Sequence, residues 1–268
     1  MKWDVPKIWS GGECWIIGGG ASMPRQFGVP ESLIQDVMSW KARPSAYSEY
    51  LSPLHDRHVI GINNVYQIGT WIDVLFFGDS SWYLVHRHPL SKWPGIKVTC
   101  CHRFSKRGEK EMEGIKYVFR DKEHRNGIST TKSAVSWNGN SGAAAISLAA
   151  HFGVKRIILL GFDMNLDDAN ISHWHGSHKP PAERKDRMKQ KRRLPPFDRH
   201  LRGFPAIAED ARKLGITILN ASPYSAITQF RKVSVKDVLE NSKTVARENS
   251  HHIGRGTIPA EVNIGQGV

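Results

Sequence analysis

Asn140-Ser141-Gly142 and, after a run of small residues, Arg156-Ile-Ile-Leu-Leu-Gly-Phe-Asp163 form the most informative part of the sequence. The polar, glycine-containing turn opens a predicted helix over residues 141–152, and this helix leads into a predicted buried strand over residues 156–161. A helix N-terminus offers unpaired N–H groups to anions, and open α/β sheets place ligand contacts just beyond the carboxyl ends of strands. Asn140, Ser141, Gly142 and Asp163 are therefore predicted to belong to a nucleotide site.

A second glycine turn ends an earlier strand, in Cys14-Trp-Ile-Ile-Gly-Gly-Gly20-Ala-Ser22. Glycine has no Cβ, so the backbone of this turn can come close to a phosphate or a sugar. The turn is not a full dinucleotide-binding fingerprint, because Met23 stands where the third glycine would be. The alternative is a tight strand-to-helix turn that contacts no ligand.

Strand and helix signals alternate along the rest of the chain. Apolar runs predict strands over 58–63, 73–78 and 216–220, with weaker signals over 96–101 and 115–119. Amphipathic stretches predict helices over 30–41, 203–214 and 234–248. Most of the strands lack apolar–polar alternation, which is typical of strands buried on both faces. The pattern predicts an α/β fold with a mostly parallel sheet and helices on both faces.

The composition favours anionic partners. The 268 residues carry a formal net charge of +13, and the sequence pI is about 9.8. No apolar run approaches the roughly 18 residues that a membrane helix needs, and the N-terminus does not resemble a signal peptide, so a cytoplasmic protein is expected. Cys14, Cys100 and Cys101 are expected to be buried reduced thiols. Without a C-x-x-C motif, no structural metal site is expected.

About half of the net charge lies in one polar segment over residues 169–202, which has no steady apolar period. We interpret this segment as a long basic loop or lid beside the site, where it would attract anions. A solvated charge run without a ligand is the alternative. Its basic residues are Lys179, Arg184, Lys185, Arg187, Lys189, Lys191, Arg192, Arg193, Arg199 and Arg202.

Polar residues follow two further strands, as Asn63-Asn64 and Gly78-Asp79. Their side chains are expected in the crevice above the sheet, although both pairs are also common in simple turns. His173, His175 and His178 form H-x-H-x-x-H in the basic segment. Histidine is the side chain best suited to proton transfer near pH 7, so one of the three is predicted to be a general base or acid. A metal site and solvated loop histidines are the alternatives.

Six motifs occur in this order: Ile17-Gly-Gly-Gly-Ala-Ser22, Ile-Asn63-Asn64, Phe-Phe-Gly78-Asp79, Asn140-Ser141-Gly142, Gly-Val-Lys-Arg-Ile-Ile-Leu-Leu-Gly161-Phe-Asp163 and Ile-Leu-Asn220-Ala-Ser222-Pro223. Over roughly residues 12–235 this order resembles two related groups of proteins. One is the bacterial CMP-sialic acid-dependent sialyltransferases with a single Rossmann-like domain. The other is the uncharacterised family similar to archaeal 6-hydroxymethylpterin pyrophosphokinase. We therefore expect one Rossmann-like domain over residues 1–249. Residues 250–268 have little apolar content, which predicts a loose tail.

The sialyltransferase resemblance implies particular site residues. Gly18, Gly20, Ser22 and Asn63 would contact the CMP-sugar, and Asn140-Ser141-Gly142 would hold the nucleotide. A loop histidine acts as the base in those enzymes, and His178 matches it best, with His175 second. Ser222 matches the serine of the Ser-Pro pair after the last core strand.

The sequence also departs from that family. Asp79 replaces an asparagine, and the phosphate-binding tyrosines are absent, since no Tyr occurs from Met164 to Pro223. Lys179 or Arg184 could replace those tyrosines electrostatically. Asp79 favours the pyrophosphokinase-like group, in which carboxylates such as Asp79 and Asp163 would hold Mg²⁺ with ATP. Compact, uncharacterised members of these groups that have such basic loops also resemble phage-encoded proteins.

These observations predict a transferase. The favoured function is a sialyltransferase-like glycosyltransferase that takes a nucleotide-activated sugar, with a CMP-sugar as the favoured donor and a glycan or another hydroxyl as the acceptor. It would require no metal or other cofactor. One alternative is a Mg²⁺-dependent diphosphokinase that uses ATP. The other is a phage DNA-modifying or nucleic-acid-binding protein that acts through the basic residues from Lys179 to Arg202.

Overall fold

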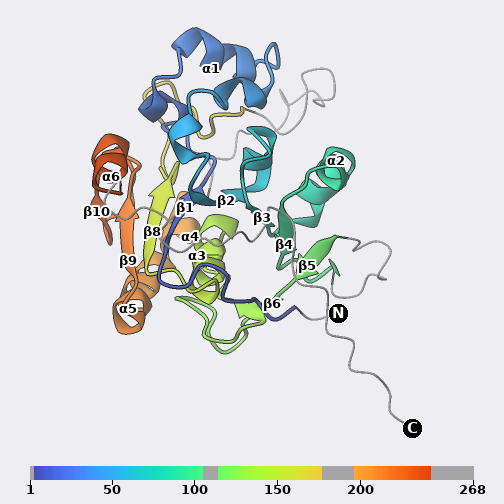
Figure 1. Ribbon diagram of the computed structural model, residues 1–268, viewed down its shortest axis with the longest axis vertical. Helices are drawn as coiled ribbons and strands as arrows, with labels where there is room; N and C mark the ends of the chain where they lie inside the picture. The colour runs from blue at the N-terminus through green and yellow to red at the C-terminus, as the bar shows by residue number, and fades with distance from the viewer. Residues whose placement is uncertain (1–2, 105–113, 177–195, 243–268) are drawn as a thin grey trace.

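The computed structural model describes residues 3–104, 114–176 and 196–242, and its centre is an eight-stranded sheet (Figure 1). Every strand pair in the sheet is parallel, which confirms the predicted α/β class with a mostly parallel sheet. The strand order is β10-β9-β8-β1-β2-β3-β4-β5. The bounds are Glu13–Ile17 (β1), His58–Ile62 (β2), Val74–Phe77 (β3), Ile96–Thr99 (β4), Ile115–Tyr117 (β5), Arg156–Leu160 (β8), Thr217–Asn220 (β9) and Arg231–Lys232 (β10).

The direction of strand addition reverses between β1 and β8. From β1 the chain adds β2 to β5 on one side, and it then returns to place β8, β9 and β10 on the other side. Ile17 at the end of β1 is opposite Leu160 at the end of β8. The carboxyl ends of these two central strands therefore form a topological switch point, the place where open α/β sheets form ligand crevices.

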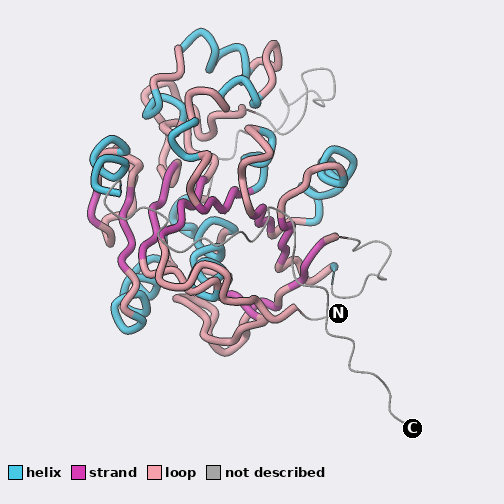
Figure 2. The backbone as a smooth tube through the Cα atoms, viewed as in Figure 1, coloured by secondary structure: helices cyan, strands magenta, loops and turns pink. Residues whose placement is uncertain are grey.

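Helices cover both faces of the sheet (Figures 1 and 2). On one face α3 and α5 cover a core that includes Ile16 and Ile157. On the other face α1, α2 and α6 cover a core that includes Trp15 and Ile158. Adjacent strand residues thus enter opposite cores, which explains why the strands lack apolar–polar alternation. The helix bounds are Glu31–Met38 (α1), Ser80–Ser91 (α2), Ser141–His151 (α3), Phe197–Leu201 (α4), Phe204–Leu214 (α5) and Val235–Ser242 (α6).

Shorter elements complete the described chain. Two strands, Phe119–Arg120 (β6) and Ala134–Val135 (β7), form a separate parallel pair. Four 3₁₀ helices span Pro24–Phe27, Pro44–Tyr47, Ser52–Leu54 and Asn63–Gln67. Cys14, Cys100 and Cys101 are buried and free of disulfides, as expected. None of the helices in the described ranges is long and apolar enough to cross a membrane.

Two differences from the sequence-based prediction concern helices that local signals did not indicate. Helix α2 was not predicted, because Pro89 interrupts its sequence and its apolar residues follow no clear helical stripe. Helix α4 lies in the segment 169–202 that was predicted to be irregular. The part of that basic segment over 177–195 and the predicted tail over 250–268 lie outside the described residues.

Candidate functional site

A cleft of about 230 Å³ lies over the carboxyl ends of β1, β2 and β8. Seven of the residues predicted from the sequence line it: Gly18, Asn63, Asp79, Asn140, Ser141, Gly142 and His175. Residues from seven separate chain segments therefore meet at the switch point of the sheet. The other lining residues are Gly19, Ile62, Trp137, Gly139, Gly161, Phe162, Met164, His173, Arg199 and His200.

Asp163 stabilises the glycine turn after β1 through hydrogen bonds and does not line the cleft. One carboxylate oxygen accepts the Ser22 backbone N–H over 2.9 Å, and the other accepts the Ser22 hydroxyl over 2.6 Å. Burial raises the pKa of Asp163, while the two bonds from Ser22 act in the opposite direction. A Cβ added to Gly20 would lie 2.5 Å from the Asp163 carboxyl carbon. Gly20, Ser22 and Asp163 thus form a packed turn, and glycine is needed at residue 20 for that contact.

Ser222 supports the turn after β8 in a similar way. Its hydroxyl accepts the backbone N–H of Phe162 over 2.8 Å, and it is fully buried. The Ser225 hydroxyl donates to the Phe162 carbonyl over 2.6 Å. Because Phe162 lines the cleft, Ser222 acts on the site by holding one of its walls.

The histidine loop lies directly on the glycine turn. Trp174 is fully buried, and its indole N–H and backbone N–H donate to the carbonyls of Gly18 and Gly19 over 3.2 and 3.0 Å. This anchor brings His173 and His175 against Gly19, with their ring centroids 5.2 Å apart. The Ser172 hydroxyl is 2.7 Å from Nδ1 of His173 and orients that ring. His178, the first choice for the base, lies outside the described residues.

The N-terminus of α3 forms the opposite part of the cleft. The Asn140 side chain accepts the Ala143 N–H over 2.8 Å and caps the helix. The N–H groups of the first turn have no acceptor within a helix, and here Ser141 and Gly142 of that turn line the cleft. This arrangement provides positive electrostatic potential for an anionic group.

Helix α4 brings two basic side chains to the same end of α3. The Asn140 amide donates to the His200 carbonyl over 3.1 Å, and Arg199 and His200 both line the cleft. Gly139 has φ +83°, and a Cβ there would lie 2.9 Å from the Arg199 carbonyl oxygen, so the approach of α4 depends on glycine. Burial lowers the pKa of His200, and Arg199 lowers it further, whereas Asp79 raises it. Together these effects favour the neutral form of the His200 imidazole.

Asn63 and Trp137 shape the remaining walls. Asn63 has φ +53°, and among the described residues its buried Oδ1 has no hydrogen-bond partner. Asn64 beside it accepts the Trp82 indole N–H over 2.7 Å and is structural. The Arg120 guanidinium stacks on Trp137, 3.7 Å from the ring centroid, and donates to the Gly78 carbonyl over 3.0 Å.

Arg199, His200 and Trp137 were not singled out as site residues by the sequence analysis. Arg199 was counted only as one charge of the basic segment, and no motif marks His200 or Trp137. The close approach of α4 to α3 could not be foreseen, because it depends on contacts between distant segments, such as the bond from the Asn140 amide to the His200 carbonyl. Lys179 and Arg184, the predicted substitutes for the tyrosines, lie outside the described residues.

The carboxylates are not arranged as a pair that could share a cation. Asp79 lines the cleft, whereas both oxygens of Asp163 are bound by Ser22. Within the described ranges, no group of three or more His, Cys, Asp or Glu side chains is placed to hold a metal ion.

The fold is similar to those of two transferases. No protein-family model matches the chain, and no curated protein sequence does. A MAf glycosyltransferase from Magnetospirillum magneticum AMB-1 matches with a TM-score of 0.51 and 11% identity over 91% of this chain. The monofunctional α-2,3-sialyltransferase Cst-I from Campylobacter jejuni matches with a TM-score of 0.50 and 12% identity, covering 83% of this chain and 80% of that one. At such identities the matches show a shared fold.

The two matches differ in extent. This chain spans 38% of the length of the MAf glycosyltransferase, so it corresponds in fold to one part of that larger protein.

Proposed function

We propose that the protein transfers a glycosyl group from a nucleotide-activated sugar to a hydroxyl acceptor. The carrying observation is that one cleft at the switch point holds the N-terminus of α3, the Arg199 and His200 side chains of α4 and two histidines of the loop 173–175. An anion site and candidate proton acceptors in one crevice are the two features that such a transfer needs. The shared fold with two glycosyl-transferring enzymes supports the same function.

In this proposal the donor phosphate lies at the N-terminus of α3. Ser141 and Gly142 offer backbone N–H groups there, and Arg199 supplies a full positive charge from α4. Burial and Arg199 favour the neutral imidazole of His200, which would donate one ring N–H to a phosphate oxygen. Together these groups would stabilise the nucleotide as it leaves, which is the main electrostatic requirement of the reaction.

The acceptor hydroxyl would lose its proton to a loop histidine. His175 is buried beside Gly19, and His173 lies against it. As the hydroxyl oxygen forms a bond to the anomeric carbon, the bond from that carbon to the donor phosphate breaks and its electron pair leaves with the nucleotide. The proton goes to the imidazole, which then returns it to solvent. His175 is our choice among the described histidines, and His178 remains the alternative base.

The nucleotide base would lie toward Asn63 and Trp137. The Oδ1 of Asn63, which has no hydrogen-bond partner within the described ranges, would accept from an exocyclic amine or a sugar hydroxyl, and Trp137 would offer an aromatic surface. Cytosine carries such an amine, as adenine and guanine do and uracil does not, so this acceptor is compatible with a CMP-sugar as the donor. The cleft residues would hold this donor without a bound metal.

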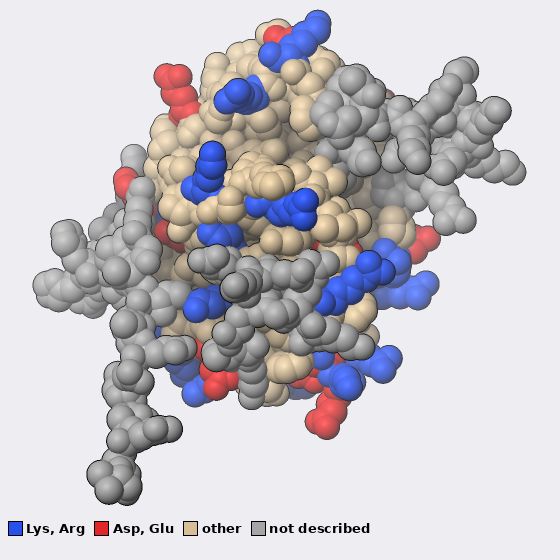
Figure 3. Space-filling view, turned by 90° about the vertical axis from the view of Figure 1, so that its right-hand side faces the viewer, with Lys and Arg blue, Asp and Glu red and all other residues tan. Residues whose placement is uncertain are grey.

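The Mg²⁺-dependent diphosphokinase is weaker on geometric grounds. It needs Asp79 and Asp163 to hold a cation together, but Asp163 is turned to Ser22 and does not line the cleft. The hypothesis of a nucleic-acid-binding protein depends on the basic segment, of which residues 177–195 lie outside the described part. On the face in Figure 3, Lys and Arg side chains of the described residues are scattered among Asp and Glu side chains and form no continuous basic track.

A binding panel tests the proposal. Thermal shift and calorimetry with CMP, UDP, GDP and ATP, each with and without Mg²⁺, should show one nucleotide that binds without the metal. A sugar-linked form of that nucleotide should bind at least as well. Binding of ATP alone, with a strict Mg²⁺ requirement, would favour the diphosphokinase. No binding of any nucleotide would contradict both enzyme hypotheses.

A further inference from the structure

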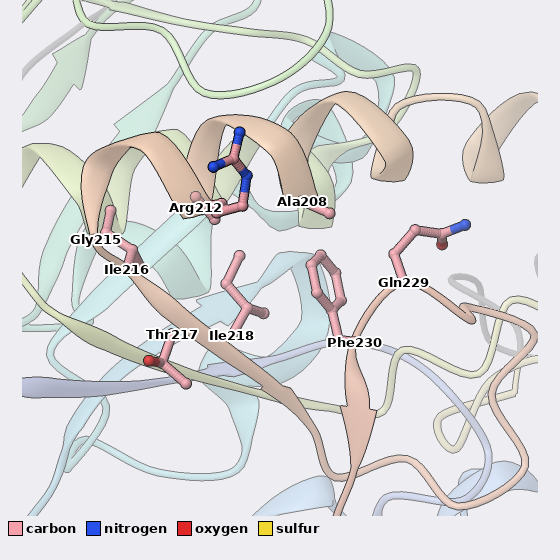
Figure 4. Close-up of a pocket in the computed structure, with 9 residues that line it drawn as sticks. Ala208, Arg212, Gly215, Ile216, Thr217, Ile218, Gln229 and Phe230 are labelled. Atoms are coloured by element: carbon pink, nitrogen blue, oxygen red, sulfur yellow. The ribbon is translucent and has the colours of Figure 1, made fainter.

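A second and larger cavity, of about 410 Å³, lies between α5, β9 and β10, and shares no lining residue with the cleft (Figure 4). Ile216, Ile218 and Phe230 contribute apolar side chains to it, and each is 7 or 8% exposed. Figure 4 shows Ile218 and Phe230 side by side beneath α5. The cavity is therefore an open groove along one margin of the sheet, where apolar side chains lie beside the polar Arg212, Thr217 and Gln229.

The sheet edge beside this groove is incompletely paired. Strand β10 pairs only with Leu219 and Asn220 of β9. Thr217 and Ala221 donate their N–H groups toward β8, to the carbonyls of Lys155 and Leu159 over 2.9 and 2.7 Å. Backbone N–H groups alternate in direction along a strand. The N–H of Ile218 therefore faces the outer edge of the sheet, just before the residues of β9 that pair with β10. Among the backbone bonds made by the described turns and loops, none comes from this N–H.

The rim of the groove is basic. Arg212 and Lys213 of α5 are 73 and 60% exposed, and Glu209 is their shared acidic partner. Asp210, the other α5 carboxylate, faces away from the groove and accepts hydrogen bonds from His124 and from the Ile128 N–H. The remaining basic side chains at this margin are the exposed Lys155, Arg231 and Lys232.

We propose that this groove and the free edge of β9 bind an extended segment of a partner protein in which apolar and acidic side chains alternate. The segment would add a strand beside Thr217 and Ile218 and accept the Ile218 N–H. Its apolar side chains would enter the groove and its carboxylates would meet the basic rim. Strand addition gains affinity from main-chain hydrogen bonds and specificity from alternate side-chain pockets.

The basic residues at this edge favour an acidic partner segment over a second copy of the chain. Two copies joined edge to edge would bring Arg231 and Lys232 near their own counterparts, and like charges at a strand edge oppose such pairing. An acidic segment relieves that repulsion. The proposal is independent of the cleft and would hold whether or not the protein is a glycosyltransferase.

Labelled peptides test the proposal on the full chain. A peptide of alternating Val and Glu should bind in fluorescence anisotropy at about 0.15 M salt, and one of alternating Val and Lys should not. Reversing both edge charges, with Arg231→Glu and Lys232→Glu, should weaken binding at least tenfold. The control variant Arg87→Glu, at an exposed position of α2, should leave peptide binding unchanged. Nucleotide binding in the cleft should be the same in all three proteins.

Backbone methylation separates strand addition from charge attraction. Two peptides would be N-methylated at every second residue, one at the odd and one at the even positions. In one of them the methyl groups replace the N–H donors that face β9 and block its approach, so this peptide should bind at least tenfold more weakly than the other. Equal binding of both methylated peptides would overturn the proposal. The proposal would also be overturned if no peptide bound, or if peptide binding appeared only after removal of residues 243–268. It would likewise be overturned if the protein were a dimer that the Arg231→Glu and Lys232→Glu variant dissociates.

Discussion

The indole N–H of Trp174 donates to the carbonyl of Gly18 over 3.2 Å, across 156 positions of sequence. This bond joins the histidine loop to the turn after β1, and the Trp174 backbone N–H adds a second bond to Gly19. His173 and His175 flank the buried tryptophan, so their positions in the cleft depend on it. Trp174 is thus a positioning residue for the proposed base.

Replacing Trp174 with Phe should loosen the histidine loop. The variant keeps most of the buried ring but loses the bond to Gly18, which should cost about 1–3 kcal/mol of unfolding free energy in urea. Trp71→Phe is the matched control, because Trp71 is also buried and its indole donates to Ser48 over 2.9 Å, away from the cleft. Both variants should lose stability, but only Trp174→Phe should weaken nucleotide binding. Equal nucleotide affinity in the two would remove Trp174 from the site.

The contact between Gly20 and Asp163 should tolerate no Cβ. Gly20→Ala places a carbon 2.6 Å from the Gly161 carbonyl oxygen as well as against Asp163, so the two turns must move apart. We expect about 1–3 kcal/mol of lost stability in denaturant titrations. The conservative variant Gly28→Ala meets no atom within 4 Å and measures backbone strain alone. A smaller loss at Gly20 than at Gly28 would argue against the packed turn.

Substitutions of Arg199 and His200 should weaken the binding of a nucleotide more than the binding of its nucleoside, which has no phosphate. Arg199→Ala or His200→Gln should weaken binding of a nucleoside monophosphate about tenfold, or 1.4 kcal/mol, because a phosphate contact is lost. Binding of the corresponding nucleoside should change little. Arg202→Ala, an exposed cation of the same segment that does not line the cleft, is the control. A uniform loss for nucleoside and nucleotide would place the phosphate elsewhere.

Stability should fall as the solution becomes mildly acidic. Burial lowers the pKa of His151 below its ordinary value of 6.5, opposed by the bond between its Nε2 and the Ala134 carbonyl. His200 is shifted in the same direction. Between the lowered pKa values of the folded state and pH 6.5, the unfolded chain then binds more protons than the folded one, so the unfolding free energy rises with pH over that range. His151→Gln should flatten the slope of stability against pH, and an unchanged slope would contradict the assignment.

The sequence was sufficient for the class of fold because the core strands are continuous apolar runs separated by glycine and polar turns. It also located the strand ends that meet in the cleft, since Gly18, Asn63, Asp79 and Ser141 each follow or begin a strong element. It could not distinguish residues that line the cleft from those that brace it. Ser22, Asp163 and Ser222 occupy the expected turns, but their polar atoms are used by neighbouring backbone and side chains.

The elements that sequence reasoning missed are those whose formation depends on contacts far along the chain. Helix α4 has five residues and no side-chain cap, and it is placed by the bond from Asn140 to the His200 carbonyl. Helix α2 forms despite Pro89 because Trp82, His86 and Leu90 bury one side of it. Tertiary packing outweighs weak local propensity in both cases.

Turnover of nucleotide-sugars in EDTA tests the central claim most directly. The wild-type protein, incubated with CMP-, UDP- and GDP-linked sugars and hydroxyl acceptors, should release nucleotide and form a glycosylated product from one donor without metal. His175→Ala should bind that donor normally and lose about 10² to 10⁴-fold in turnover, the usual loss when a general base is removed. If His178 is the base, the same loss should follow His178→Ala instead. Failure of every donor to react, or equal turnover after removal of each loop histidine in turn, would contradict the account.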